Sequence, residues 1–589
     1  MSNISLFQEQ MQKNNISAYI ITISDYHNTE YVCDHFKSLQ FLSGFTGSAG
    51  TLVILQKSAY LWTDGRYHIQ AEKQVQNSAI VVMKEGEPNV PSIGEYLNSV
   101  LRSTDIIAFD GKTMNANKIL EIKSKIKKQS IQYIYNLDLI NNIWSERPKL
   151  PFSILYKLDT FFSGNDYDDK LLDVQGKLYE ANADMLILSA LEDQAWLYNL
   201  RGNDIPNTPV FLAYTIVSTD STILFIDQNK IDLIVEKYLN ENDVIIKPYN
   251  EIYDYIKSIK GKHIVLDLNK TNYTIYSSLN DNNTILNMTN PTTLLKAIKN
   301  ETEIKNIKLA HEKDGLAFAK FMYYVKESYK YKNDISELSL TKYLDDLRME
   351  NPGYVEKSFN TICAYNAHGA MMHYSATIET DSIIDNTGFL LVDSGAHYLE
   401  GTTDITRTLA LGEISDEMKL HFTTVLKSMI ALSKAKFLSG CTGSNLDVLA
   451  RAPIWDLLID YKCGTGHGVG YLLSVHEGPN GFRWYNNSTK LVPGMITTNE
   501  PGIYLENKYG IRLENELLCV KNATNEFGEF LSFETLTYAP IDLDAINVDL
   551  LSSDEKSWLN DYHSKVFEII SPNLSTEEVE WLMQATRKI

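Results

Sequence analysis

The sequence predicts a multidomain protein of mixed α/β and α+β class: two similar α/β domains, a larger α+β domain and a short helical C-terminal extension. Three observations support this interpretation. The chain has 589 residues, too many for a single hydrophobic core. A pattern of helix, strand, turn and strand near the N-terminus returns roughly 170 residues later. Strand patterns dominate between residues 354 and 520, and Ser552–Ile589 has the periodicity of two amphipathic helices.

The first α/β domain is predicted over residues 1–155. Leu6–Lys13 has helical periodicity, and the Gly-rich segment Ser43–Gly50 separates the first predicted strand from the next two. The third strand ends at Asp64-Gly65-Arg66, which has the composition of a tight turn. The predicted strands are Ala18–Thr22, Thr51–Leu55 and Ala59–Trp62.

The second α/β domain is predicted over residues 156–302, after a seam in the Pro-containing stretch Glu146–Asn165. It repeats the first pattern with a helix at Leu171–Asn182, and Trp196–Gly202 occupies the place of Phe41–Phe45. Its predicted strands are Asp184–Ala190, Val210–Val217 and Thr222–Asp227. We interpret this as a weak internal repeat.

The α+β domain is predicted over residues 303–530 and the extension over residues 531–589. A polar, turn-rich stretch at Asn287–Lys299 precedes this domain. Helical periodicity occupies Glu301–Glu327 and then Ser336–Glu350, which Asn351-Pro352-Gly353 closes. Two later helices are predicted among the strands, at Asp416–Phe437 and Asn445–Asp460.

Charge and composition exclude several classes of partner. The net charge of −21 argues against nucleic acid or an anionic membrane, because an acidic surface repels both. No apolar run reaches the length of a membrane span, and no secretory signal is visible in Met1–Asn15. The 5 cysteines are few and scattered, which favours free thiols in a reducing compartment. We therefore expect a cytoplasmic protein.

Two carboxylates mark a candidate metal site. Asp393 follows the apolar run Phe389–Val392, and Asp404 lies in the segment Gly401–Arg407. A carboxylate at the end of a buried strand costs free energy unless something neutralises it. Two such groups side by side repel each other, and a bound cation removes the repulsion.

Three further residues complete a ligand set of four carboxylates and one imidazole. His467 lies among four glycines in Gly464–Gly470, Glu500 lies in Thr498–Gly502, and Glu514 lies in Gly510–Asn515. Each segment alone has the composition of an ordinary loop or turn. In this order the five residues could bridge two divalent cations, which points to hydrolysis. The oxygen-rich set favours Mn²⁺, with Co²⁺ and Zn²⁺ possible.

These segments resemble the pita-bread metallopeptidases, the family that includes aminopeptidase P, prolidase and methionine aminopeptidase. The spacings of 11, 63, 33 and 14 residues between the five ligands are similar to those of the cytosolic three-domain Xaa-Pro aminopeptidases. The resemblance covers nearly the whole chain. It implies two creatinase-like domains, a pita-bread catalytic domain and a homodimer. Segments outside the ligand set that carry it are Leu61–Tyr67, Pro540–Asp542 and Trp558–His563.

The resemblance also implies roles for residues around the metals. His373 and His476 match histidines that contact substrate and stabilise the tetrahedral intermediate, and an imidazole can donate to a developing oxyanion. Taken alone, His373 could equally be an interior histidine bonded to backbone. Arg512 and Tyr504 match positions that line the site, although Arg512 could instead orient Glu514.

Two other positions bear on the comparison with the family. Arg66 matches an arginine that takes part in substrate binding, which the resemblance implies to occur across a dimer contact, but the residue could equally be an exposed turn residue. Cys463 departs from the family, which commonly has a histidine four residues before the metal-binding one. A thiol is the weaker hydrogen-bond partner, so details of the pocket beyond the scissile bond are open.

The sequence thus predicts an Xaa-Pro aminopeptidase in which a hydroxide bridging two cations attacks the first peptide bond. Glu500 would be both a ligand and the group that handles the proton, while His467 would bind a metal and line the substrate site. One alternative is a prolidase limited to Xaa-Pro dipeptides. The other is a non-catalytic binding protein on the same fold, although such proteins typically lose ligands.

Overall fold

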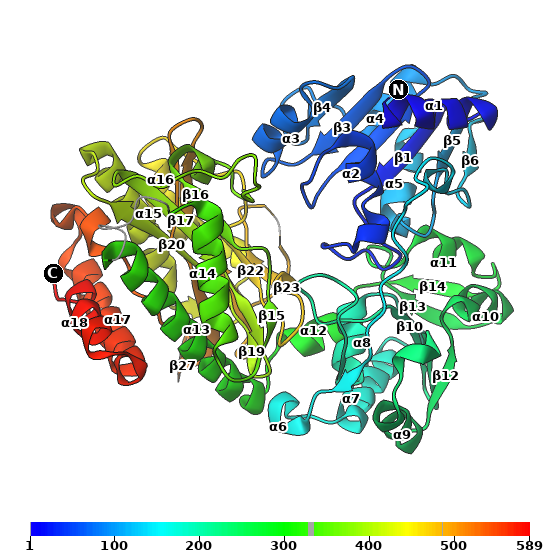
Figure 1. Cartoon of the computed structure of the whole chain (residues 1–589). Coiled ribbons are helices and arrows are strands. Elements are labelled where there is room, and N and C mark those ends of the chain that lie inside the picture. Colours follow the sequence, from blue (N-terminus) through cyan, green and yellow to red (C-terminus); the bar gives the residue numbers. More distant parts are fainter. Residues whose placement is uncertain (1, 328–334, 486) are drawn as a thin grey trace. The chain divides into compact units, whose positions relative to one another are not determined.

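The computed structural model describes residues 2–327, 335–485 and 487–589, and it divides into two compact units (Figure 1). The first unit comprises Met1–Asp159 and Asn165–Thr293, and the second comprises Thr160–Gly164 and Leu294–Ile589. The second unit contains all five predicted metal ligands and the C-terminal extension.

The first unit contains two six-stranded sheets of the same topology, with orders β4-β3-β2-β1-β5-β6 and β12-β11-β10-β8-β13-β14. In both sheets the first three of these strands along the chain pair antiparallel and the outer strands pair parallel. The strands of the first sheet are β1 Ala18–Thr22, β2 Thr51–Leu55, β3 Ala59–Thr63, β4 Ile80–Lys84, β5 Ile106–Phe109 and β6 Gln132–Ile134. Those of the second are β8 Met185–Leu188, β10 Ala213–Ser218, β11 Thr222–Ile226, β12 Val244–Pro248, β13 His263–Leu266 and β14 Thr284–Asn287.

The helices of the first unit repeat in the same way, which confirms the prediction of two similar α/β domains. The pairs are α1 Asn3–Lys13 with α7 Tyr167–Glu180, α2 Ser38–Ser43 with α8 Leu191–Leu197, α3 His68–Val75 with α9 Leu233–Glu241, α4 Ile93–Val100 with α10 Ile252–Ser258, and α5 Ala116–Lys125 with α11 Tyr273–Ser278. Helices α1 and α7 begin earlier than predicted because Ser2 and Asp166 cap them through their side chains.

Four long helices of the second unit lie where they were predicted, and one of them has the predicted bounds. Helix α13 spans Glu301–Glu327 as predicted, and α14 spans Glu337–Met349 after Ser336, which forms a capping box with Ser339. Helix α15 spans Asp416–Ser433 and α16 spans Gly443–Trp455. The stretch predicted to be polar and turn-rich contains α12, Pro291–Ala297, which begins at a proline whose fixed φ suits a first helical turn.

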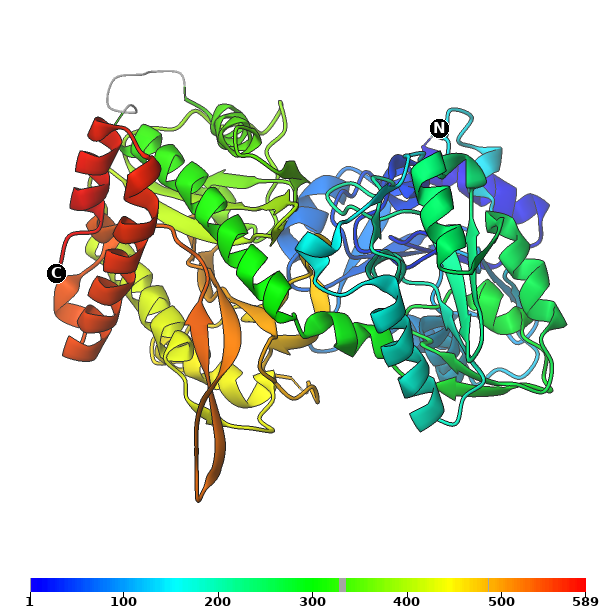
Figure 2. The same ribbon diagram turned by 90° about the horizontal axis from the view of Figure 1, so that it is seen from below.

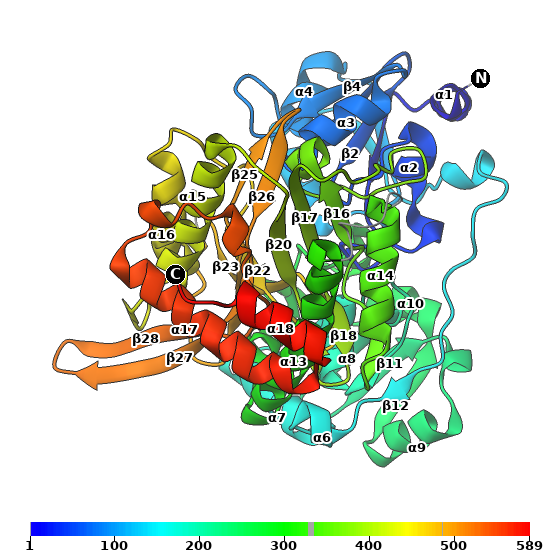
Figure 3. The same cartoon turned by 60° about the vertical axis from the view of Figure 1, so that its left-hand side comes forward.

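The sheets of the second unit bring distant segments together. Their orders are β15-β18-β19, β16-β17-β20, β21-β28-β27-β24-β22-β23 and β25-β26. Figure 3 shows β27 and β28 as a long hairpin. The strand bounds are β15 Tyr354–Lys357, β16 Ile362–Tyr365, β17 Gly388–Ser394, β18 Ala396–Tyr398, β19 Gly401–Thr402, β20 Ile405–Leu411, β21 Phe437–Leu438, β22 Gly466–Gly468, β23 Glu477–Phe482, β24 Ile496–Asn499, β25 Gly502–Leu505, β26 Tyr509–Arg512, β27 Asn515–Asn525 and β28 Gly528–Thr535.

The C-terminal extension packs onto this unit. Helices α17 (Ser553–Ile570) and α18 (Thr576–Ala585) both contact α13 (Figure 2). Leu559 of α17 and Leu582 of α18 are buried in the same hydrophobic cluster as Phe389 of β17 and Ile511 of β26. Burial of apolar surface therefore joins the extension to the strands that carry the predicted ligands.

Candidate metal centre

Two antiparallel strands place the predicted aspartates next to each other. Asp393 is the penultimate residue of β17, and Asp404 immediately precedes β20. The two strands pair with Asp393 opposite Thr406, so the end of one lies beside the beginning of the other. Both aspartate side chains are buried.

The other three predicted ligands approach the same place from a second sheet. His467 is the middle residue of β22, whose neighbour Gly468 pairs with Thr497 of β24. Glu500 follows β24, and its backbone N–H donates to the Thr465 carbonyl at 2.8 Å. A Cβ on Gly466 would lie 1.8 Å from the Thr498 carbonyl oxygen, so only glycine permits this close approach beside His467.

Glu514 links the two sheets. It lies between β26 and β27, and its backbone N–H donates to the Thr406 carbonyl of β20 at 3.1 Å. The Thr406 hydroxyl in turn donates to Glu514 Oε2 at 2.6 Å. This double contact fixes the glutamate against the strand that Asp404 precedes.

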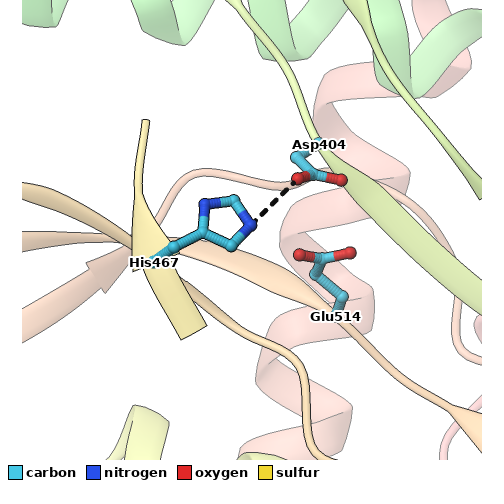
Figure 4. Close-up of side chains that lie close together, drawn as sticks. All are labelled: Asp404, His467 and Glu514. Atoms are coloured by element: carbon cyan, nitrogen blue, oxygen red, sulfur yellow. Dashed lines mark ion pairs between the residues drawn. The ribbon is translucent and has the colours of Figure 1, made fainter. Parts of the chain in front are cut away.

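Ligand atoms of Asp404, His467 and Glu514 all lie within 4.8 Å of one another (Figure 4). His467 Nε2 is 3.5 Å from Asp404 Oδ2 and 3.4 Å from Glu500 Oε1. The structure thus places four of the predicted ligands close together, namely His467 and the three carboxylates of Asp404, Glu500 and Glu514. Asp393 lies outside that three-residue group, but its charge raises the pKa of both Asp404 and Glu514.

Two of the carboxylates leave an oxygen available to a cation. Asp393 Oδ2 accepts from Arg512 Nη2 at 2.5 Å, whereas Asp393 Oδ1 is buried and has no hydrogen-bond partner among the described residues. Glu514 Oε1 is open in the same way, opposite the oxygen that Thr406 holds. Buried acceptors are normally satisfied, so these open oxygens fit a metal-binding role.

The electrostatics of the centre also fit a cation. Burial, followed by the charges of Glu514, Asp393 and Glu500, raises the pKa of Asp404 well above its usual value. Burial, followed by Glu500 and Asp393, does the same to the pKa of Glu514. Burial also raises the pKa of Glu500, although the Arg512 guanidinium opposes this. Several ionised carboxylates in one buried site require positive charge close by.

These raised pKa values predict how metal removal affects stability. Carboxyls of the unfolded chain ionise near pH 4, whereas the buried ones retain protons to higher pH. The metal-free native state therefore binds more protons, and its stability should fall as pH rises from about 4 through the raised values. A cation binds the ionised form, so the melting-temperature difference between metal-loaded and chelated protein should widen with pH.

Differential scanning fluorimetry across this pH window, with chelator or with Mn²⁺, measures that difference. The Asp404→Asn variant should show a weaker pH dependence in chelator. A difference that stays constant or narrows with rising pH would contradict the assignment.

Arg512 and Tyr504 lie beside the centre, as the resemblance implied. The buried guanidinium of Arg512 contacts Asp393, donates from Nη1 to the Tyr504 hydroxyl at 2.8 Å, and donates from Nε to Thr406 Oγ1 at 3.2 Å. Arg512 also supports Glu514 indirectly, because the Thr406 hydroxyl that accepts from Arg512 donates to Glu514. This contact fits the alternative prediction that Arg512 orients Glu514.

The two predicted catalytic histidines belong to the same unit. The ring of His476, between β22 and β23, lies 4.3 Å from the His467 ring with an interplanar angle of 85°. His373 is flanked by Met372, whose carbonyl accepts from Arg512 Nη2 at 3.4 Å, and by Tyr374. The Tyr374 hydroxyl donates to Glu337 Oε2 at 2.9 Å.

Sequence reasoning missed Glu337, which anchors the segment containing His373. Its buried carboxylate also accepts from the Tyr365 backbone N–H at 2.7 Å and lies 2.8 Å from His368 Nδ1. The available signal was a glutamate directly after the helix-capping Ser336, where a first-turn acidic residue is ordinary. Nothing in that pattern indicates burial.

Arg66 and Cys463 have defined local surroundings. Arg66 belongs to the first unit, where Nε and Nη2 donate to the two carboxylate oxygens of Asp64 at 2.9 and 2.8 Å. The other predicted site residues belong to the second unit. Cys463 and Tyr504 are both partly buried and pack against the same hydrophobic cluster, and the Cys463 carbonyl accepts from Arg451 Nη2 at 2.6 Å.

The fold and the acidic centre are those of a metallopeptidase, and comparison with known proteins gives the family. Residues 305–521 match the model of metallopeptidase family M24, and residues 529–589 match the C-terminal region of peptidase M24. Residues 4–137 and 146–303 match two models of the creatinase/prolidase N-terminal domain. The chain belongs to metallopeptidase family M24, and several relatives that match it over nearly its whole length are named as Xaa-Pro aminopeptidases or aminopeptidase P.

Two such relatives align over nearly the whole chain. Aminopeptidase P2 of Arabidopsis thaliana is 37% identical over 98% of this chain and 86% of its own length. Xaa-Pro aminopeptidase 1 of Dictyostelium discoideum is 36% identical over 97% of this chain and 94% of its own length.

Solved structures confirm the predicted fold class. The X-prolyl aminopeptidase from Caenorhabditis elegans, described as a cytosolic enzyme with a di-nuclear active site, matches with a TM-score of 0.93 and 33% identity. The match covers 98% of this chain and 95% of that one. The Xaa-Pro dipeptidase from Bacillus anthracis shares the fold over 64% of this chain, with a TM-score of 0.51 and 24% identity.

Proposed function

We propose that this chain is a metal-dependent Xaa-Pro aminopeptidase, which removes the N-terminal residue from peptides with proline in second position. The observation that carries the proposal is the buried group of acidic side chains around His467, with open oxygens on Asp393 and Glu514. Full-length similarity to Xaa-Pro aminopeptidases, including one with a di-nuclear active site, supports the same conclusion.

Two divalent cations fit this donor set. Asp393, Asp404, His467, Glu500 and Glu514 would hold them, and the predominance of oxygen donors favours Mn²⁺ over Co²⁺ or Zn²⁺. When bound, the cations supply an activated water at neutral pH and compensate the negative charge that develops on the substrate.

The side chains of the protein would guide the protons and the developing charge. Glu500, whose pKa is raised by burial, would accept a proton and deliver it to the leaving proline nitrogen. His373 and His476 would donate hydrogen bonds to the oxyanion. The buried carboxylates would attract the free α-amine of the substrate, which limits cleavage to the N-terminal residue.

Selectivity for proline would depend on shape. The proline amide has no N–H, so the enzyme cannot recognise it by a hydrogen bond from that nitrogen. We assign the wall around the proline ring to His373, His476 and Arg512, with Tyr504 holding the arginine.

Turnover of an Xaa-Pro-Xaa tripeptide tests the proposal directly. Protein treated with chelator should be inactive, and addition of Mn²⁺ should restore release of the N-terminal residue, measured by mass spectrometry or amine detection. Comparing Arg-Pro-Pro with the dipeptide Gly-Pro then distinguishes this activity from that of a prolidase.

The tripeptide should be the better substrate, because relatives that match this chain over nearly its whole length are named aminopeptidases rather than dipeptidases. Hydrolysis of Gly-Pro alone would instead favour a prolidase. Failure to bind any divalent cation would favour a non-catalytic protein, although the full ligand set argues against that.

Other properties follow as proposals from the same relationship. We propose a cytoplasmic location and a homodimer, with Arg66 available for substrate binding across the dimer contact. The scattered cysteines, none of them in a disulfide among the described residues, are compatible with that compartment. No helix in the described ranges has the length and apolarity that crossing a bilayer requires. The predicted domain seams near residues 155, 302 and 530 remain predictions.

A further inference from the structure

A pocket of about 400 Å³ opens beside the metal centre within the second unit. Its volume is within the range of small-ligand sites. His467 and His476 form one wall, so the pocket starts where the proposed metals would lie. The remaining lining includes Glu477, Arg483, Tyr485, Asn487 and Ser488.

Two lysines already neutralise Glu477, the acidic residue in the pocket lining. Glu477 is buried, with Oε1 lying 2.8 Å from Lys299 Nζ and Oε2 lying 3.1 Å from Lys296 Nζ. Both lysine side chains are also buried. Glu477 therefore has two cations of its own and does not offset other positive charge in the pocket.

Arg483, in contrast to Glu477, has no ion-pair partner among the described residues. No carboxylate oxygen of the described residues lies within 4.0 Å of its guanidinium, in a chain whose net charge is −21. Its Nη1 donates to the Tyr485 hydroxyl at 2.6 Å, and its guanidinium carbon lies 5.7 Å from the centre of that ring. The hydroxyl orients the guanidinium but carries no charge to balance it.

Two glycines lie next to the arginine side chain. A Cβ on Gly464 would lie 3.3 Å from Arg483 Cγ, and a Cβ on Gly481 would lie 3.6 Å from Arg483 Nε. Gly481 pairs with His467 across β22 and β23. The guanidinium stem therefore packs on backbone that is continuous with the proposed metal ligand.

We propose that Arg483 is a specificity-determining residue that binds the C-terminal carboxylate of short peptide substrates. This inference rests on the proposed function. With the α-amine held at the acidic centre, the far end of a short peptide carries its terminal negative charge. A guanidinium binds a carboxylate through two parallel hydrogen bonds, which makes arginine well suited to this task.

The proposal defines a substrate class. Short Xaa-Pro peptides with a free C-terminus should bind better than their C-terminal amides, because the amide cannot form a charge-assisted pair. Longer peptides would carry the terminal carboxylate beyond the pocket and lose the same interaction. The preference should appear in KM, because the carboxylate is remote from the scissile bond. Its binding free energy should therefore be the same in the substrate complex and in the transition state.

The experiment compares Arg-Pro-Pro with its C-terminal amide on metal-loaded wild-type protein and on three variants. Arg483→Gln removes the charge, Arg483→Lys retains a point charge without the bidentate geometry, and Lys490→Gln removes an exposed charge from the same loop. Metal content and melting temperature are measured for each variant, so that loss of folding is recognised.

For wild type and Lys490→Gln, amidation should raise KM roughly 10- to 100-fold and leave kcat nearly unchanged. For Arg483→Gln the acid and the amide should have equal KM values, and Arg483→Lys should lie between. An amidation effect that is absent from wild type, or equally large in Arg483→Gln, would overturn the inference.

A third peptide, Arg-Pro-Pro-Asp amide, separates a terminal carboxylate from an acidic side chain. If the KM of this peptide depends on Arg483 as strongly as the KM of the free acid Arg-Pro-Pro, then Arg483 binds acidic side chains. The proposal that it binds the C-terminal carboxylate would then be wrong. If wild type hydrolyses none of the three peptides, the proposed function itself fails, and this inference fails with it.

Discussion

Replacing Asp404 with alanine should reduce Xaa-Pro cleavage by a factor of about 1,000 or more. The buried Asp404 carboxylate lies within 4.8 Å of ligand atoms of both His467 and Glu514, and burial and then the charges of four neighbouring carboxylates raise its pKa. Loss of this group removes a ligand at the point where the others converge. A metal ion contributes several kcal/mol to the transition state, which corresponds to about that factor in rate.

Steady-state turnover of Arg-Pro-Pro and metal content per chain are the two measurements for this variant. Asp385→Ala is a suitable control, because Asp385 is an exposed aspartate on the same unit. Both activity and metal content should fall in Asp404→Ala and remain normal in the control. Full activity in Asp404→Ala would remove the basis for the ligand assignment.

Replacing Arg407 with methionine should lower the free energy of unfolding by about 4–5 kcal/mol, a large loss for a single substitution. The guanidinium is fully buried and donates to the carbonyls of Thr406 and Glu514 at 2.8 and 2.5 Å. It also donates to the Tyr562 hydroxyl of α17 at 2.8 Å. Further acceptors are Asn515 Oδ1 and the carbonyls of Ala539 and Pro540. Methionine would leave several of these buried acceptors unsatisfied.

Melting of the metal-loaded protein tests this effect, with an expected decrease on the order of 10 °C. Arg587→Met is the matched control, since Arg587 is exposed near the C-terminus. Metal affinity should also weaken in Arg407→Met, because the carbonyl of the ligand Glu514 loses its donor. An unchanged melting temperature would show that the network contributes little net free energy.

The elements that could be predicted from sequence are those with local signals. Helix Glu301–Glu327 had sustained periodicity, and the tandem domains repeated the same order of elements. Helix α15 ends at Ser433, short of the predicted Phe437, because Phe437 instead pairs with Leu531 in β21 and β28. Such an ending depends on a strand almost a hundred positions away, so periodicity alone could not locate it.

The same distinction applies to the site. Asp393 and Asp404 were identifiable because each adjoins an apolar strand, and the ordered motifs supplied His467 and the two glutamates. The supporting contacts were not identifiable, since Glu337 and Arg407 act through partners remote in sequence. The pocket position of Arg483 likewise depends on how β22 and β23 pair.

The long separation between Arg407 and Tyr562 bears on how the protein is made. The hydrogen bond spans 155 positions, and α17 follows all the strands of its unit along the chain. Domains generally fold as units during synthesis, from the N-terminal end onward. The two α/β domains can therefore fold before the second unit is synthesised, whereas the second unit cannot complete its core until α17 has been made. A nascent chain that stalls before α17 should thus present an unfinished, aggregation-prone core to chaperones.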